Sequence, residues 1–269
     1  MRRMPFSSMY RLPRPRPAWR PRVCSAMLLA LGLAGCASLP PSVGKALPAD
    51  VLLLGEQHDA PSHQRLHHDT VSALASRGQL AALALEMADQ GSSTRGLAPN
   101  ADEAAVRQAL RWNEAAWPWA SYGPAVMAAV RAGVPVLGAN LPRSDLRAAM
   151  GDESLDPRLP PPALARQREA IRAGHCDLLP PGQIAPMARI QIARDRAMAQ
   201  TVSEAAQARK VVVLLAGHAH VDPEIGVPQH LPQNLRVRAV TWPPSPPARD
   251  YCADLRQQMQ APREKPAKP

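Results

Sequence analysis

Two stretches of the sequence decide the fold: VLLLGEQHD at 51–59 and VVVLLAGHAH at 211–220. Each begins with consecutive large apolar residues and reaches a glycine that is followed three positions later by a histidine. An apolar run without polar alternation is typical of a strand that is buried on both faces, and such strands occur in parallel sheets. The two stretches therefore predict central strands at 51–54 and 211–216.

Similar apolar runs recur along the chain, and segments with helical periodicity separate the first four runs. The remaining predicted strands are 82–86, 134–138 and 236–240. The predicted helices are 62–77, 102–112, 123–132, 144–150, 162–174 and 184–207. Because buried strands alternate with helices, the sequence predicts an α/β fold around a mainly parallel sheet of about five strands.

Polar side chains follow the predicted strands at their carboxyl ends. In chain order they are Glu56, His58, Glu86, Asn140, His218 and His220. The carboxyl ends of parallel strands lie along one edge of the sheet, where such folds bind their ligands. Histidine titrates near neutral pH and is the commonest metal ligand, so these residues suit metal coordination, haem contact or acid–base chemistry.

The helix predicted at 62–77 adds two more histidines, His63 and His67, one helical turn apart. His63 shares the apolar face of this helix, whereas His67 and His68 are expected to turn progressively outward. His63 and His67 are therefore candidate ligands only if further groups from the strand ends join them, since two histidines alone are a weak metal signal.

The charge of the chain does not indicate nucleic-acid binding. The formal net charge of +10 arises mostly at the start, because residues 1–35 contain seven of the 32 basic residues and none of the 22 acidic ones. Beyond residue 35 the net charge is +3, with no stripe of basic residues interleaved with aromatics. Nucleic acid is therefore excluded as a partner.

The first 36 residues read as an export signal. An Arg- and Pro-rich segment at 11–22 precedes an apolar run at 23–34, and Leu-Ala-Gly-Cys at 33–36 resembles the bacterial lipobox. This predicts a signal peptide at 1–35, lipidation of Cys36 and a tether at 36–49 leading to the domain. A plain secretory signal is the alternative. Ala37 and Ser38 lack the aspartate of inner-membrane retention, so the resemblance favours the outer membrane.

Two cysteines, Cys176 and Cys252, remain once the signal and Cys36 are set aside. Because exported proteins enter an oxidising compartment, we predict a disulfide between them, in preference to a thiol active site. The bond would hold the Pro-rich C-terminal segment against the domain. Residues 259–269 are predicted to be a disordered tail.

Five stretches together resemble the ChaN-like, haem-binding uptake family of bacterial lipoproteins. They are LLLGEQHD (52–59), Leu85-Glu86-Met87, WPWASYGPAVMAAVRAGVPVLGANLPR (117–143), QIARDRAMA (191–199) and LLAGHAHVDPEIGVPQHL (214–231). The resemblance implies one domain at 50–258 with a three-layer α/β/α fold, anchored to a membrane by lipid. It also implies haem binding for iron uptake, is compatible with a homodimer, and suggests hand-over to an outer-membrane haem receptor.

The candidate haem-contacting residues are His58, His63, Tyr122, Arg194, His218 and His220. Tyr122 is a candidate because a phenolate can bind haem iron, although it could simply pack with Trp117 and Trp119. Arg194 could contact a haem propionate, or it could form a structural network with Asp195.

A wider superfamily with the same arrangement includes erythromycin esterase-like proteins and Tiki/TraB metal-dependent proteases. That resemblance implies an alternative function, a metal-dependent hydrolase with Glu56, His58, Glu86 and His220 as active-site residues. His58, Glu86 and His220 would hold the divalent metal. Of the two, the sequence favours a haem-binding lipoprotein over an enzyme.

Overall fold

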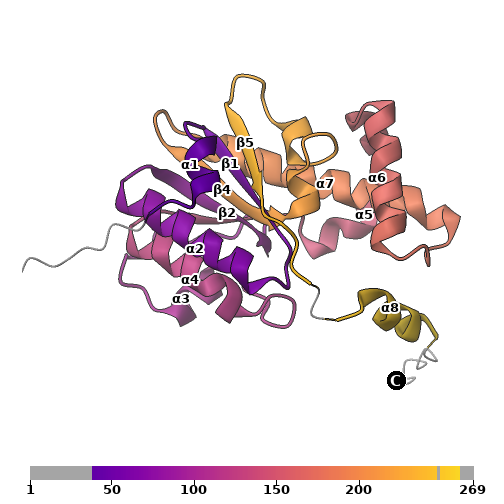
Figure 1. Cartoon of the computed structure of the whole chain (residues 1–269), viewed down its shortest axis with the longest axis horizontal. Coiled ribbons are helices and arrows are strands. Elements are labelled where there is room, and N and C mark those ends of the chain that lie inside the picture. The colour runs from indigo at the N-terminus through magenta and orange to yellow at the C-terminus, as the bar shows by residue number, and fades with distance from the viewer. Residues whose placement is uncertain (1–37, 247–248, 261–269) are drawn as a thin grey trace, which may run out of the picture. The chain divides into compact units, whose positions relative to one another are not determined.

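The computed structural model describes residues 38–246 and 249–260 and contains one five-stranded sheet (Figure 1). Its strands are β1 (Val51–Glu56), β2 (Leu80–Asp89), β3 (Val136–Asn140), β4 (Val211–Gly217) and β5 (Val237–Thr241). They lie in the order β3-β2-β4-β1-β5, and every neighbouring pair is parallel. The prediction of a parallel α/β sheet is confirmed, and β1, β4 and β2 are its central strands.

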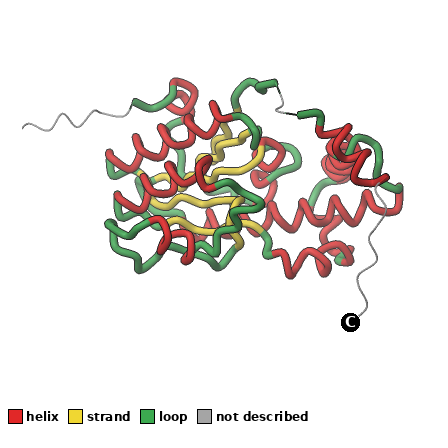
Figure 2. Tube along the Cα trace, turned by 90° about the horizontal axis from the view of Figure 1, so that it is seen from below, coloured by secondary structure: helices red, strands yellow, loops and turns green. Residues whose placement is uncertain are grey.

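Helices cover both faces of the sheet, so the three-layer α/β/α architecture is also confirmed (Figure 2). The helices on one face are α2 (Pro61–Ser76), α3 (Glu103–Ala109) and α4 (Trp119–Arg131). On the other face lies the C-terminal half of α7 (Pro181–Ala205). In β1, Leu52 and Leu54 pack toward the first set of helices. Val51 and Leu53 pack toward α7, because successive side chains of a strand point to opposite faces.

A smaller helical region follows β3 and packs against the N-terminal half of α7. It consists of η1 (Arg143–Asp145), α5 (Leu146–Gly151), the 3₁₀ segment η2 (Glu153–Arg158) and α6 (Pro161–Gly174). Leu155, Leu159 and Ile192 form one small apolar cluster there, and Ile171 and Ile184 belong to a second. Among the described residues, no helix has the length and apolar character that crossing a membrane requires.

The chain just before the sheet is more ordered than a tether. Residues 41–46 of the predicted tether form a helix, α1 (Pro41–Ala46), and Val43 is fully buried in the core beneath it. Trp242, which follows β5, donates a hydrogen bond from Nε1 to Ser42 Oγ at 3.3 Å. This segment therefore folds as part of the domain. The predicted signal peptide at 1–35 and the lipidation site Cys36 lie outside the described residues.

At the other end of the chain, a helix that the sequence analysis did not predict, α8 (Tyr251–Gln260), carries Cys252. The disulfide between Cys176 and Cys252 is present, as predicted, and links α8 to the turn between α6 and α7. Residues 259 and 260 of the predicted tail belong to α8, and 261–269 lie outside the described residues.

Gly138 in β3 offers a test of the packing at the edge of the sheet. A Cβ atom there would clash with Ser92 Oγ and with the backbone oxygen of Asp89, and the Asp89 oxygen cannot move without shifting the backbone at the end of β2. We expect Gly138→Ala to lower the free energy of unfolding by about 1–3 kcal/mol. Urea denaturation followed by circular dichroism measures the change. Gly44→Ala, where a Cβ would meet no atom within 4 Å, is the matched control and should not destabilise the protein.

Candidate functional site

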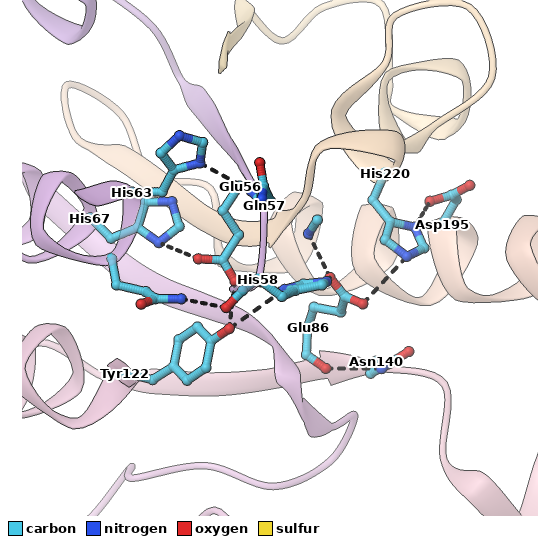
Figure 3. A network of polar contacts seen from close by, with 12 residues as sticks. Glu56, Gln57, His58, His63, His67, Glu86, Tyr122, Asn140, Asp195 and His220 are labelled. Atoms are coloured by element: carbon cyan, nitrogen blue, oxygen red, sulfur yellow. Dashed lines mark hydrogen bonds and ion pairs between the residues drawn. The ribbon is translucent and has the colours of Figure 1, made fainter. Parts of the chain in front are cut away.

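Four of the polar residues predicted at the strand ends, Glu56, His58, Glu86 and His220, meet at the carboxyl ends of the three central strands (Figure 3). Glu56 is the last residue of β1, Glu86 lies near the end of β2, and His220 lies in η3 (His218–Val221), directly after β4. Because these strands are adjacent and parallel, residues far apart in sequence come together at one edge of the sheet.

One half of the site is a buried ion triad of Glu86, His220 and Asp195. His220 Nδ1 lies 2.6 Å from Asp195 Oδ1 of α7, and His220 Nε2 lies 3.4 Å from Glu86 Oε1. The other oxygen of Glu86, Oε2, accepts a hydrogen bond of 2.7 Å from the Gly217 amide. These contacts tie β2, β4 and α7 together at the strand ends.

The triad is charged near neutral pH. Burial lowers the pKa of His220, but Glu86 and Asp195 on its two sides outweigh burial and raise this pKa to about 10. Burial raises the pKa of Glu86, but His220, His58 and the Gly217 amide together lower it to about 2. Burial raises the pKa of Asp195 to about 6, against the opposing effect of His220. His220 is therefore an imidazolium held between two carboxylates.

The other half of the site is built on Glu56. Its Oε1 lies 2.7 Å from His58 Nδ1 and accepts a hydrogen bond of 2.6 Å from the Tyr122 hydroxyl. Tyr122 is 2% exposed, and its ring meets Trp117 edge to face. Burial and the Glu56 charge raise the pKa of the Tyr122 hydroxyl, so it is a neutral phenol that donates to Glu56. Tyr122 thus packs with Trp117 and also orients Glu56.

His58 joins the two halves. Its side chain is 40% exposed, and its Nε2 lies 3.9 Å from Glu86 Oε2. Burial lowers the pKa of His58, but the hydrogen bond to Glu56 and the charge of Glu86 outweigh burial and raise it. A Cβ atom at position 217 would lie 2.8 Å from His58 Nε2, so a side chain there would force the His58 ring to shift.

His63 and His67 are both buried in α2, and the expectation that His67 turns outward is wrong. His63 Nδ1 accepts a hydrogen bond from the Gln57 amide, and its Nε2 donates to the Pro243 oxygen, so both ring nitrogens are satisfied by backbone. His67 Nδ1 lies 3.4 Å from Glu56 Oε2. Burial, with smaller contributions from His63 and His58, lowers the pKa of His67 to about 3, so its ring is neutral.

His218 faces a different space from His220. It lines a cavity of about 860 Å³ beside the ends of β1 and β5, here called the strand-end cavity. Other residues that line it are Val221, Trp242, Pro244 and Tyr251. His218 is exposed, and within the described part of the chain its ring forms no hydrogen bond or ion pair. Of the six candidate haem contacts, only His63 and His218 line this cavity.

Arg194 does not pair with Asp195, whose carboxylate binds His220 instead. Arg194 Nε is buried without a hydrogen-bond partner, so the proposed network between these neighbours is absent from the described residues. Asp195 is a member of the site that was not predicted from the sequence. The one feature of the sequence that could have indicated this role is that Asp195 interrupts the apolar stripe of a long helix.

The metal site of the alternative function does not form in the described residues. No three His, Cys, Asp or Glu side chains there are arranged to hold a metal ion. The proposed ligands were His58, Glu86 and His220. Both ring nitrogens of His220 already point at carboxylates. The geometry at His220 is that of an ion pair, in which the ring donates two protons.

Together, the fold and site define a parallel α/β/α protein with a buried histidine–carboxylate cluster at the ends of its central strands. The chain belongs to the family described as haem-binding uptake, Tiki superfamily, ChaN, whose model matches residues 43–231. This match runs from α1 to η4 (Val227–His230) and confirms the resemblance found in the sequence.

Two solved structures are similar to the chain. One is described as cofacial haem binding to ChaN of Campylobacter jejuni. It is 24% identical, covers 74% of this chain and 83% of its own, and superposes with a TM-score of 0.60. The other, the type III effector HopBA1, is 17% identical, covers 77% of this chain and 86% of its own, and has a TM-score of 0.41. A comparison with curated proteins found no match.

The protonated state of His220 predicts a loss of stability at alkaline pH. Its pKa rises from an ordinary 6.5 to about 10 on folding, so its stabilising effect is complete below about pH 6.5 and disappears as the pH approaches 10. We expect the free energy of unfolding to fall by on the order of 3 kcal/mol across this window. Urea denaturation at several pH values measures it.

His220→Gln should remove this pH dependence while lowering stability at every pH, because it leaves two buried carboxylates without their partner. His68→Gln, at an exposed histidine of α2, is the control and should keep the wild-type profile. An unchanged free energy of unfolding across the window in the wild-type protein would contradict the charged state of His220.

Proposed function

We propose that the protein binds haem in the strand-end cavity, with His218 as a ligand to the iron. The observation that carries this proposal is a free imidazole in a largely apolar cavity, in a chain that belongs to a haem-binding family. The cavity of about 860 Å³ falls within the roughly 300–1,000 Å³ typical of sites for small molecules and cofactors.

The residues of the cavity fit the chemistry of haem. Val221, Trp242 and Pro244 offer apolar contact for a porphyrin face, and His218 offers a nitrogen ligand of the type that holds haem iron in many proteins. Bound haem would supply an iron centre, and the protein would determine which side chains reach it. Tyr251 of α8 also lines the cavity, and the Cys176–Cys252 disulfide retains that helix.

The buried ion triad has a positioning role in this proposal. His218 and His220 share the short turn η3, and His220 is fixed by Asp195 on one side and Glu86 on the other. Because η3 cannot shift without disturbing these contacts, the triad holds His218 at the rim of the cavity. Glu56 and Gln57 line the same cavity from the end of β1.

A haemin titration tests the assignment of His218. Haemin added to the purified protein should shift the Soret band saturably, and His218→Ala should weaken binding about tenfold or more through loss of the iron ligand. His68→Ala, at an exposed histidine outside the cavity, should bind haemin like the wild type. If His218→Ala binds normally and His58→Ala does not, the iron ligand is His58 and our assignment is wrong.

We further propose that the protein is exported, anchored by lipid at Cys36 in the cell envelope, most favourably the outer membrane, and serves iron uptake. The Leu-Ala-Gly-Cys sequence at 33–36 and the uptake function in the family description support this proposal. Transfer of haem to an outer-membrane receptor would follow from such a location. Cofacial haems, as described for ChaN of Campylobacter jejuni, need two facing surfaces, so we also propose a homodimer.

Lipidation at Cys36 can be tested in a bacterial host. The wild-type chain should incorporate labelled palmitate and sediment with membranes, because acyl chains on one residue hold a protein to a bilayer. Cys36→Ala should lose both the label and the membrane association. Cys24→Ala, within the predicted signal peptide, is the matched control and should keep both. Labelling that persists in Cys36→Ala would contradict the proposed anchor.

A further inference from the structure

A second large cavity lies away from the strand-end cavity, and the proposed haem site does not use it. Its volume is about 880 Å³, and none of its lining residues is shared with the strand-end cavity. Residues from α5, η2, α7 and η4 surround it. We call this space the arginine cleft, after Arg158 and Arg196, which line it together with His230.

The two arginines of the cleft have no counter-charge in contact with them. Elsewhere in the structure, arginines such as Arg189 and Arg236 form ion pairs with aspartates, at 2.9 Å and 2.7 Å. Within the described residues, neither Arg158 nor Arg196 forms a hydrogen bond or an ion pair. Two guanidinium groups that line one cavity without partners create a region of positive potential.

His230, which also lines the cleft, has an unsatisfied polar atom. Its Nε2 is buried and has no hydrogen-bond partner among the described residues. Burial lowers the pKa of His230 to about 4, and the charges of Arg196 and Arg158 contribute in the same direction. The ring is thus neutral, and the charges that act on it are the two arginines. A buried nitrogen without a partner is costly unless a ligand or water satisfies it.

Two acidic residues also line the cleft, but they bond elsewhere. Asp145 accepts a hydrogen bond from Ser144 Oγ at 2.8 Å, and Asp152 accepts one from the Ser154 amide at 3.0 Å. Neither forms an ion pair with Arg158 or Arg196. The hydrogen bonds with Ser154 are the main cause that lowers the pKa of Asp152, and the charges of Arg196 and Arg158 lower it by smaller amounts. The two aspartates keep their negative charges, but the charges that act on His230 are those of Arg196 and Arg158, so the positive charge of the cleft lies nearest His230.

We propose that the arginine cleft binds a small amphipathic anion, with its phosphate or carboxylate group between Arg158, Arg196 and His230 Nε2. Guanidinium groups bind both kinds of anion with paired hydrogen bonds. The apolar body of the ligand would lie against Leu141, Ala149 and Leu155, which also line the cleft. This site is distinct from the proposed haem site, because the two cavities share no lining residue.

Calorimetric titration of the full-length protein in detergent with hexyl phosphate, hexanoate and hexanol tests this proposal. We expect saturable binding of at least one of the two anions, and binding of the uncharged hexanol at least about tenfold weaker. If hexyl phosphate binds more tightly, the group recognised is a phosphate; if hexanoate does, it is a carboxylate. Equal binding of hexanol, or no binding of either anion, would overturn the proposal.

Variants locate the site. Arg196→Gln and Arg158→Gln should each weaken binding of the anion by about tenfold, and thermal melting should show that these exposed positions tolerate the change. Arg131→Gln, at the end of α4 and outside the cleft, is the matched control and should bind like the wild type. An equal loss in Arg131→Gln would reveal general charge attraction and would overturn the site.

Discussion

His220 is held between the carboxylates of Glu86 and Asp195, and the strand-end architecture depends on this buried ion triad. Glu86 comes from β2, Asp195 from α7, and the histidine from the turn after β4, so one imidazolium connects the sheet to the helix on one of its faces. Because each member is buried, losing one would leave an uncompensated charge in the interior. The surrounding structure must therefore keep all three in place. Because His220 belongs to η3, the triad also favours one position of that turn.

Local sequence patterns were sufficient to predict the strands of the sheet, but not to predict α1, which precedes the sheet in the chain. Runs such as 211–216 are apolar on both faces, and that property is sufficient to place them inside a parallel sheet. The helix α1 offers no such pattern, because it is short and buries Val43 alone. It contacts Trp242, which lies two hundred residues later in the chain. A contact of that kind carries no signal in the local periodicity of either segment.

The sequence predicted where the site lies, at the strand ends, but it did not predict which side chains contact each other there. The sequence located Glu56, His58, Glu86 and His220 at one edge of the sheet, since parallel topology alone brings them there. It could not show that Asp195 would reach His220 from a helix, or that Tyr122 would donate to Glu56. His67 was misplaced because Trp242 contacts the rings of both His63 and His67, so the segment after β5 covers a side of α2 that appears exposed when the helix is considered alone.

The segment after β4 contributes to both cavities, which explains why its conformation matters beyond the triad. His218 at its start lines the strand-end cavity, and His230 at its end lines the arginine cleft. Between them, Gly226 packs so closely against the backbone of His220 that a side chain there would clash with the His220 carbonyl. The segment is thus folded back on the residue that the triad fixes. The residue that the triad fixes therefore packs against the same segment that supplies one histidine to each cavity.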